Sequence, residues 1–161
     1  MKQEIKALSQ EAYNRHLQRY LPTHQCKKCN SPNYTNHGSY PRQVYFSQTK
    51  GTTISVLRLK CQSCASTQII LHPEIVPFKR YCLSFLICLL VMHKAGQSNY
   101  QIRKSLGVSP SHIRVLLRQF NDWHKLGLEV LGVSLPPPNV NEFTRQYKAR
   151  FSYDFMQVIS H

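Results

Sequence analysis

CKKCN (residues 26–30) and CQSCA (residues 61–65) are the two stretches that decide the fold, because each holds a Cys-x2-Cys pair. A redox dithiol needs one such pair, usually at the start of a helix in a βαβ pattern. Two pairs supply four thiolates, and a tetrahedron of thiolates, each about 2.3 Å from the ion, is the closed geometry of structural zinc. We therefore predict one structural Zn²⁺ ion, bound by Cys26, Cys29, Cys61 and Cys64.

The residues around the second pair are typical of strands and predict a small zinc ribbon. TTISVLRLK (residues 52–60) is rich in β-branched and aliphatic residues, and STQII (residues 66–70) would form the return strand of a hairpin. The 31 residues between the pairs have room for one further hairpin, with a turn near SQTKG (residues 47–51). Four thiolates leave no open coordination position, which indicates that the metal supports folding rather than catalysis.

The residue after each pair often needs a left-handed backbone, which glycine and asparagine tolerate best. Asn30 meets this requirement and Ala65 does not, so we expect the two turns to differ in shape. We interpret Cys82 and Cys88 as buried free thiols. Nearby histidines could replace a cysteine, but we interpret them as surface or hydrogen-bonding residues: His24, His37 and His72.

The chain is strongly basic, with 21 Lys and Arg against 7 Asp and Glu and a formal net charge of +14. The excess lies in residues 21–80 (+7) and 81–127 (+5), whereas residues 128–161 carry no net charge. Charge of this sign and density favours a polyanionic partner, usually nucleic acid. The N-terminus lacks a secretory signal, and the apolar run at residues 81–92 is too short to span a bilayer. We therefore expect a cytoplasmic, nucleoid-associated protein.

A helix-turn-helix is predicted after the ribbon. The apolar run forms a buried helix that ends at residues 95–96. Ser98 then caps a short helix that ends in a left-handed Gly107. Ser109 caps the next helix, with Pro110 at its first position. Apolar residues recur along that helix at helical spacing and form one buried stripe: Ile113, Leu116, Leu117, Phe120 and Trp123.

The second helix of this motif would enter the major groove of duplex DNA by its N-terminus. The face opposite the stripe carries the residues predicted to read bases: Ser111, His112, Arg114, Val115 and Arg118. Basic residues of the ribbon are predicted to contact phosphates and position the helix: Lys27, Lys28, Arg42, Arg58 and Lys60. The alternative is a helical hairpin whose exposed face is basic without reading DNA.

Several motifs together resemble the N-terminal part of certain bacterial insertion-sequence transposases: CKKCNSPNYTNHGSYPRQ, LRLKCQSCAS and LGVSPSHIRVLLRQF. The ribbon pattern is matched at His37, Gly38, Tyr40, Arg42, Arg58, Cys61 and Cys64. The chain looks still more like short bacterial proteins, known only as a domain of unknown function, that keep this half alone. The resemblance implies a zinc ribbon followed by a helix-turn-helix. The transposases continue into an RNase H-like catalytic domain, for which the 34 residues after residue 127 are too few.

The predicted fold class is α+β, in four segments. These are an N-terminal helix (residues 1–21), the zinc ribbon (22–78), the helix-turn-helix (79–127), and a Pro-rich linker with a C-terminal helix (128–161). The last helix carries an aromatic stripe that packs in the core or, alternatively, contacts a second copy of the chain: Phe143, Tyr147, Phe151 and Phe155.

We expect a non-enzymatic, sequence-specific protein that binds duplex DNA, as a regulator or an accessory factor of a mobile element. A mobile-element protein and a second copy of the chain are further candidate partners. One alternative is a zinc-ribbon adaptor that binds RNA or a protein complex, which aromatic residues of the ribbon keep open: Tyr34, Tyr40, Tyr45 and Phe46. Another is a non-catalytic subunit or remnant of a transposase.

Overall fold

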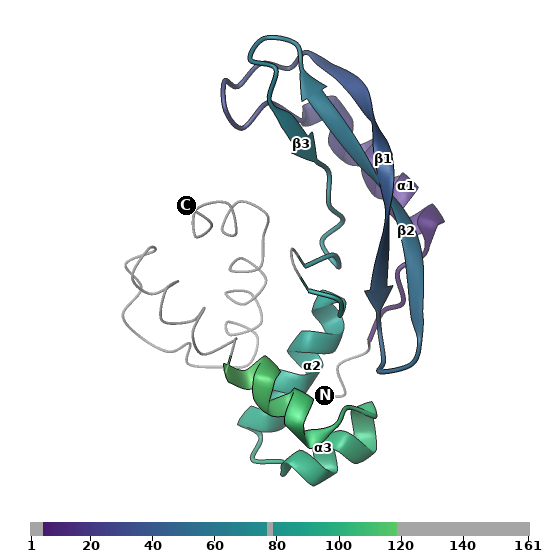
Figure 1. Cartoon of the computed structure of the whole chain (residues 1–161), viewed down its shortest axis with the longest axis vertical. Coiled ribbons are helices and arrows are strands. Elements are labelled where there is room, and N and C mark those ends of the chain that lie inside the picture. The colour runs from purple at the N-terminus through teal and green to yellow at the C-terminus, as the bar shows by residue number, and fades with distance from the viewer. Residues whose placement is uncertain (1–4, 77–78, 119–161) are drawn as a thin grey trace.

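The computed structural model describes residues 5–76 and 79–118, and these form an α+β fold, as predicted. A three-stranded antiparallel sheet runs along one side of the molecule, the N-terminal helix lies against this sheet, and the later helices lie at one end of it (Figure 1). The predicted linker and C-terminal helix, like Phe120 and Trp123 of the predicted stripe, lie outside the described residues.

The N-terminal helix, α1 (Gln10–Tyr20), begins later than predicted, and residues 5–9 precede it without helical structure. Ser9 sets the start, because its backbone is extended and its side-chain oxygen accepts a hydrogen bond from Ala12 N at 3.1 Å. A serine in this position satisfies a backbone N–H that no helical carbonyl can reach. A single 3-10 turn, η1 (Leu21–Thr23), follows α1 and leads towards the first cysteine pair.

Two long strands, β1 (Tyr34–Tyr45) and β2 (Gly51–Cys61), form an antiparallel hairpin, and the short β3 (Thr67–Ile69) pairs with the far end of β2. These bounds confirm the predicted strands and the turn near residues 47–51. Ile54 and Val56 of β2 are fully buried, whereas the neighbouring Ser55 is exposed, as expected for a strand that buries one face.

α1 covers the edge of β2 that β3 is too short to reach. Gln10 Oε1 accepts a hydrogen bond from Ser55 N at 2.7 Å. The Tyr13 hydroxyl accepts one from Leu57 N at 2.8 Å and donates one to Ile70 O at 2.7 Å. These side chains take the place of a missing strand, so the backbone groups stay paired and the edge is shielded from other chains.

The predicted apolar helix is α2 (Leu83–Lys94), which ends, as predicted, at Ala95 and a left-handed Gly96. The side chain of its N-cap residue, Cys82, makes no hydrogen bond to the backbone N–H groups of the first turn. Glu74 does so from outside, because its Oε2 accepts a hydrogen bond from Ser84 N at 2.8 Å. A carboxylate at a helix N-terminus is also stabilised by the helix dipole.

The next helix has the predicted bounds, and the one after it begins where predicted. Ser98 and Gln101 form a reciprocal capping box at the start of α3 (Asn99–Leu106), which ends at Gly107 with φ of 72°. Residues 110–118 are again helical. Ser109 caps them, since its side-chain oxygen accepts a hydrogen bond from His112 N at 3.3 Å.

One hydrophobic core joins the sheet to the helices. Its buried members come from α1, both long strands, α2, α3 and the segment 110–118, and include Tyr13, Val44, Ile54, Phe85, Ile102 and Ile113. Cys82 is buried in this core, and the half-buried Cys88 packs against it. No helix within the described residues has both the length and the apolar character needed to cross a membrane.

Candidate metal centre

The first cysteine pair lies in a tight turn, residues 26–31, which we call the first knuckle. Cys26 N donates a hydrogen bond to Ser31 O at 2.9 Å, and Asn30 N donates one to Cys26 O at 2.7 Å. Asn30 has a left-handed backbone, with φ of 57°. The loop that holds this knuckle connects η1 to β1, so no strand leads into it.

The second pair lies in the second knuckle, residues 61–66, which connects β2 to β3. Cys61 N donates to Ser66 O at 2.9 Å and Ala65 N donates to Cys61 O at 3.0 Å. Ala65 has φ of 59°, almost the same value as Asn30. The prediction that the two turns differ in shape is therefore wrong, because alanine adopts here the conformation that asparagine adopts in the first knuckle.

The two knuckles face each other and bring the four sulfur atoms together. Sγ of Cys26 lies 3.6 Å from Sγ of Cys64, and Sγ of Cys29 lies 3.6 Å from Sγ of Cys61. All four atoms lie within 4.8 Å of one another. A tetrahedral site with bonds of about 2.3 Å has sulfur–sulfur edges of about 3.8 Å, whereas a disulfide has about 2.05 Å. The cysteines are free thiols positioned to hold one metal ion.

Hydrogen bonds to sulfur favour the thiolate form that metal binding requires. The Ser66 hydroxyl lies 3.3 Å from Cys26 Sγ and 3.0 Å from Cys64 Sγ, so it bridges the two knuckles. This hydroxyl is the main reason that the pKa of Cys26 falls to about 6, although burial opposes it. The same hydroxyl lowers the pKa of Cys64.

Cys29 is the exposed ligand, and its pKa is raised, whereas the pKa values of Cys26 and Cys64 are lowered. The backbone N–H of Ser31 lowers the pKa of Cys29, but burial and hydrogen bonds to the other three thiols outweigh it and raise that pKa to about 12. A bound cation would therefore have to displace the proton of Cys29.

A chain of hydrogen bonds runs from Cys26 through Gln68 and His24 to Tyr20. Gln68 Nε2 donates to Cys26 Sγ at 3.3 Å, and Gln68 Oε1 lies 3.2 Å from His24 Nε2. Since an amide oxygen can only accept, His24 carries its proton on Nε2, and its Nδ1 accepts from the Tyr20 hydroxyl at 3.1 Å. His24 and Gln68 are both buried, so this chain is shielded from water. His24 is thus a hydrogen-bonding residue, as interpreted from the sequence.

Ser66 and Gln68, whose side chains both hydrogen-bond to ligand sulfurs, were not predicted from the sequence. Nothing in their local sequence distinguishes them from surface residues. Gln68 could have been found only by noting that a polar residue sits in the return strand, two positions after Ser66. The other two histidines lie apart from the cysteines: His37 is exposed on β1, and His72 packs edge-on against His16.

The two knuckles, the hairpin between them, α2 and α3 lie in a segment that a family of sequences shares. The family described as Domain of unknown function (DUF6431) matches residues 26–107, just over half of the 161 residues. The chain belongs to the DUF6431 family. The match begins at Cys26 and ends at the left-handed Gly107. No curated protein and no solved structure matches the chain. The predicted likeness to a domain of unknown function is confirmed, and the likeness to transposases stays a prediction.

Within the DUF6431 segment, the motif around His37 serves the hairpin. Gly38 has φ of 85° at an irregularity where the register between β1 and β2 shifts. A side chain at Gly38 would only touch Arg58, with its Cβ at 3.7 Å from Nη2, so the backbone conformation is what requires glycine. Arg42 Nη2 donates to the carbonyls of Val76 and Lys79, at 2.6 and 3.3 Å. Its guanidinium therefore ties β1 to the segment before α2.

The predicted base-reading residues lie on the segment 110–118, just beyond the DUF6431 match. Four of them are exposed and share one helix face: Ser111, Arg114, Val115 and Arg118. His112 is half-buried instead, and its ring packs edge-on against Tyr81 at 5.5 Å. Ile113 is fully buried on the opposite side, as predicted.

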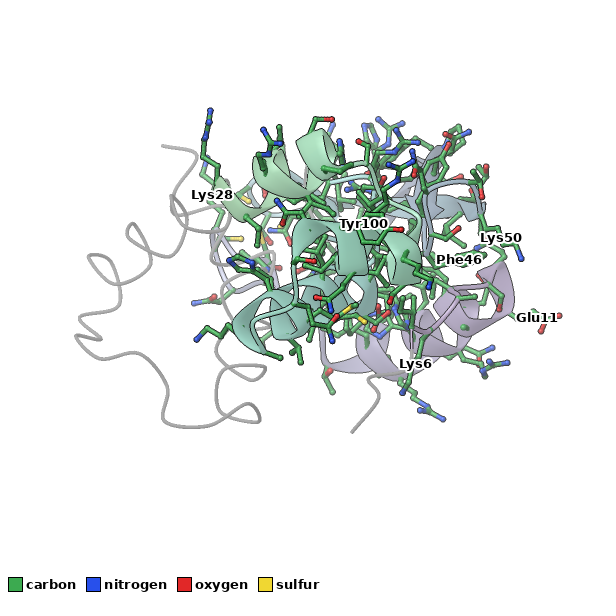
Figure 2. All side chains as sticks on the ribbon, turned by 90° about the horizontal axis from the view of Figure 1, so that it is seen from below. Lys6, Glu11, Lys28, Phe46, Lys50 and Tyr100 are labelled. Atoms are coloured by element: carbon green, nitrogen blue, oxygen red, sulfur yellow. The ribbon has the colours of Figure 1, made fainter. Side chains whose placement is uncertain are left out.

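The predicted phosphate-contacting residues of the ribbon are spread over its length. Lys27 and Lys28 are exposed on the first knuckle, and Figure 2 shows Lys28 projecting from the molecule. Lys60 is exposed beside the second knuckle, whereas Arg42 and Arg58 are half-buried. The knuckles lie at the end of the hairpin opposite α2 and α3 (Figure 1), so the structure does not bring these lysines next to residues 110–118.

Proposed function

We propose that this chain is a non-enzymatic protein that binds duplex DNA through α3, the turn at residues 107–109 and the helical segment 110–118, acting as a helix-turn-helix. The observation that carries the proposal is the exposed face of residues 110–118. Ser111, Arg114, Val115 and Arg118 are exposed at the spacing i, i+3, i+4 and i+7, while Ile113 is fully buried behind them.

The chemistry of this face suits the major groove. Arg114 and Arg118 can each donate two hydrogen bonds to guanine O6 and N7. Val115, which is 46 % exposed, offers an apolar surface for a thymine methyl group. Ser111 completes the face as a permissive donor or acceptor. His112 contributes less than the sequence alone suggests, since its ring is turned towards Tyr81.

The surrounding charge supports a polyanionic partner. Within residues 5–76 and 79–118, Glu11 and Glu74 are the only acidic residues, and Glu74 already caps α2. The basic side chains are therefore not neutralised by a comparable number of carboxylates. A surface of this kind gains affinity by releasing the counterions of a nucleic acid.

We further propose that the metal is zinc and that its role is structural. Four thiolates form a soft ligand set that selects zinc over magnesium or calcium. A closed set of four protein ligands leaves no position for a substrate, which fits a non-catalytic role. The metal would hold the two knuckles together and thereby present Lys27 and Lys28 at the far end of the ribbon.

The hairpin is long enough for Lys27 and Lys28 to contact the same DNA duplex as residues 110–118. β2 has 11 residues, and a strand rises about 3.3 Å per residue, so its far end, where the two knuckles face each other, lies about 35 Å from the β1–β2 turn. One turn of B-DNA measures about the same, roughly 34–36 Å. We propose that Lys27 and Lys28 contact the phosphate backbone about one helical turn away from the groove that residues 110–118 occupy. A regulator or accessory factor of a mobile element is the biological role that fits best.

The adaptor alternative, in which the ribbon binds RNA, receives less support. Tyr34 stacks on the His24 ring at 4.9 Å, and Tyr40 and Tyr45 are half-buried. Proteins that bind single-stranded RNA stack its unpaired bases on exposed aromatic rings of a sheet. These tyrosines are less exposed than that mode of binding requires.

A binding comparison tests the proposal. The probes are a duplex selected from a random library by the wild-type protein, a scrambled duplex, and single-stranded DNA and RNA of the selected sequence. We expect the selected duplex to bind best. Arg114→Ala or Arg118→Ala should cost about 1–3 kcal/mol on the selected duplex and little on the scrambled one.

The double variant Lys27→Gln/Lys28→Gln should weaken binding to both duplexes equally and lower the slope of log affinity against log salt by up to about 1.8. Arg19→Ala, an exposed arginine on α1, serves as the matched control and should change neither. Tighter binding to RNA, or an unchanged sequence preference in both arginine variants, would contradict the proposal.

A further inference from the structure

The hairpin is joined to the helices by a short β-like pairing beside the segment 110–118. Tyr45 N, at the end of β1, donates a hydrogen bond to Arg80 O at 2.7 Å, and Cys82 N donates to Tyr45 O at 2.8 Å. Tyr45 and Tyr81 form a parallel bridge between these two stretches. The backbone of Arg80 is therefore held by the sheet, although residue 80 lies outside its strands.

The side chain of Arg80 is exposed, yet its position is defined by the rings around it. Its guanidinium carbon lies 4.1 Å from the centre of the Tyr45 ring and 5.6 Å from that of Tyr81. Stacking of this kind uses the face of the guanidinium and leaves the N–H donors at its edge available. A planar donor group is thus held on an exposed surface with little rotamer freedom left to lose on binding.

The same rings place Arg80 beside the first turn of the segment 110–118. Tyr81 contacts Arg80 on one side, and on the other its ring packs edge-on against His112 at 5.5 Å. Burial and then the charge of Arg80 lower the pKa of His112, which keeps that ring neutral and leaves Arg80 as the cation at this position. Ser111, the first residue of the exposed face, is the immediate neighbour of His112.

We propose that Arg80 is a phosphate-binding residue that anchors the DNA backbone beside the N-terminal end of the segment 110–118, held in position by the Tyr45 ring. This inference rests on the proposed function. A helix that enters the major groove by its N-terminus brings that end close to a phosphate strand, so a cation there sets the depth and angle of entry. Because the Arg80 backbone is bonded to β1, the anchor also orients the ribbon along the same duplex.

The test uses the full chain with the selected and scrambled duplexes described above, at several salt concentrations. Arg80→Gln should weaken binding to both duplexes equally and lower the log–log salt slope by about 0.9, which is about eightfold in affinity near 0.1 M salt. Arg80→Lys keeps the charge and should keep the slope while losing part of the affinity. Arg15→Gln, on the exposed side of α1, is the matched control and should leave binding unchanged.

A second variant separates the charge from its positioning. Tyr45→Leu leaves Arg80 in place but removes the ring beneath it, so affinity should fall by a smaller factor on both duplexes. Proton NMR spectra of each variant check that the fold is retained. If Arg80→Gln binds like the wild type while Arg114→Ala loses its preference, the inference is wrong and the proposed function stands. A loss confined to the selected duplex would make Arg80 a base-reading residue and would also overturn the inference. A wild-type protein that does not bind duplex DNA would overturn both.

Discussion

The two knuckles have the same backbone and different side chains. Each is a six-residue turn with the same pair of backbone hydrogen bonds and the same left-handed residue after the second cysteine. That residue is Asn30 in the first knuckle and Ala65 in the second. Asparagine tolerates this conformation, whereas alanine is disfavoured in it by about 1–2 kcal/mol. The shape of the second knuckle therefore comes from what surrounds it rather than from its local preference.

The surroundings of the two knuckles differ as well. Cys26 Sγ shares a hydrogen bond with the Ser66 hydroxyl across the site and accepts one from Gln68 on β3, so residues of the second half of the ribbon support the first knuckle. The positions between the cysteines are Lys27 and Lys28 in one knuckle and uncharged residues, Gln62 and Ser63, in the other. The four-cysteine cluster thus joins two turns of the same backbone shape whose side chains differ.

The largest expected effect follows from removing one ligand. Cys61→Ser should release the metal and unfold both knuckles together, because structural zinc contributes roughly 10–16 kcal/mol of apparent binding free energy to such folds. Elemental analysis should find about one equivalent of zinc in the wild type and none in the variant. Cys88→Ala, outside the cluster, should keep the metal. A metal-free variant that retains the amide chemical shifts of both knuckles would show that the cluster does not set their shape.

An intermediate effect is expected from the residues that support the first knuckle. Gln68→Leu removes the hydrogen bond to Cys26 and should weaken metal binding about 10- to 100-fold, as is usual for groups that orient a ligand. Competition with a chromophoric chelator measures this change. Gln62→Leu alters an exposed glutamine of the second knuckle and should have no effect. Equal affinities in the two variants would mean that Gln68 does not support the metal.

The smallest effect is expected from replacing the left-handed residues, Asn30 and Ala65, by glycine. Ala65→Gly should raise the free energy of unfolding of the metal-bound protein by about 1 kcal/mol, because glycine adopts a φ of 59° without strain. Asn30→Gly should change it by less than about 0.5 kcal/mol, since asparagine already tolerates the conformation. Urea unfolding followed by circular dichroism measures both. A loss of stability in Ala65→Gly would indicate that the alanine side chain contributes packing that outweighs its strain.

Features that depend on neighbours in the chain were predictable. The Cys-x2-Cys spacing identified the four cysteines that come together, since each pair closes a turn within a few residues. The start and end of α3 and the start of the segment 110–118 followed from Ser98, Gly107 and Ser109, which act on backbone groups at most four residues away. The α+β class followed in the same way from the pattern of strands and helices.

Other features were decided only by the tertiary structure, because the partners are far apart in the chain. Tyr13 bonds Leu57 and Ile70, and Gln68 bonds Cys26, across separations of 42 to 57 residues that no local pattern reports. Amphipathic spacing marked the face of the segment 110–118, but only the position of Tyr81 turned His112 away from solvent. Local preference would have kept Ala65 out of a left-handed turn. The closing of the two knuckles into one site overrides it, because the contacts among the four cysteines and the hydrogen bonds around them outweigh about 1–2 kcal/mol of backbone strain.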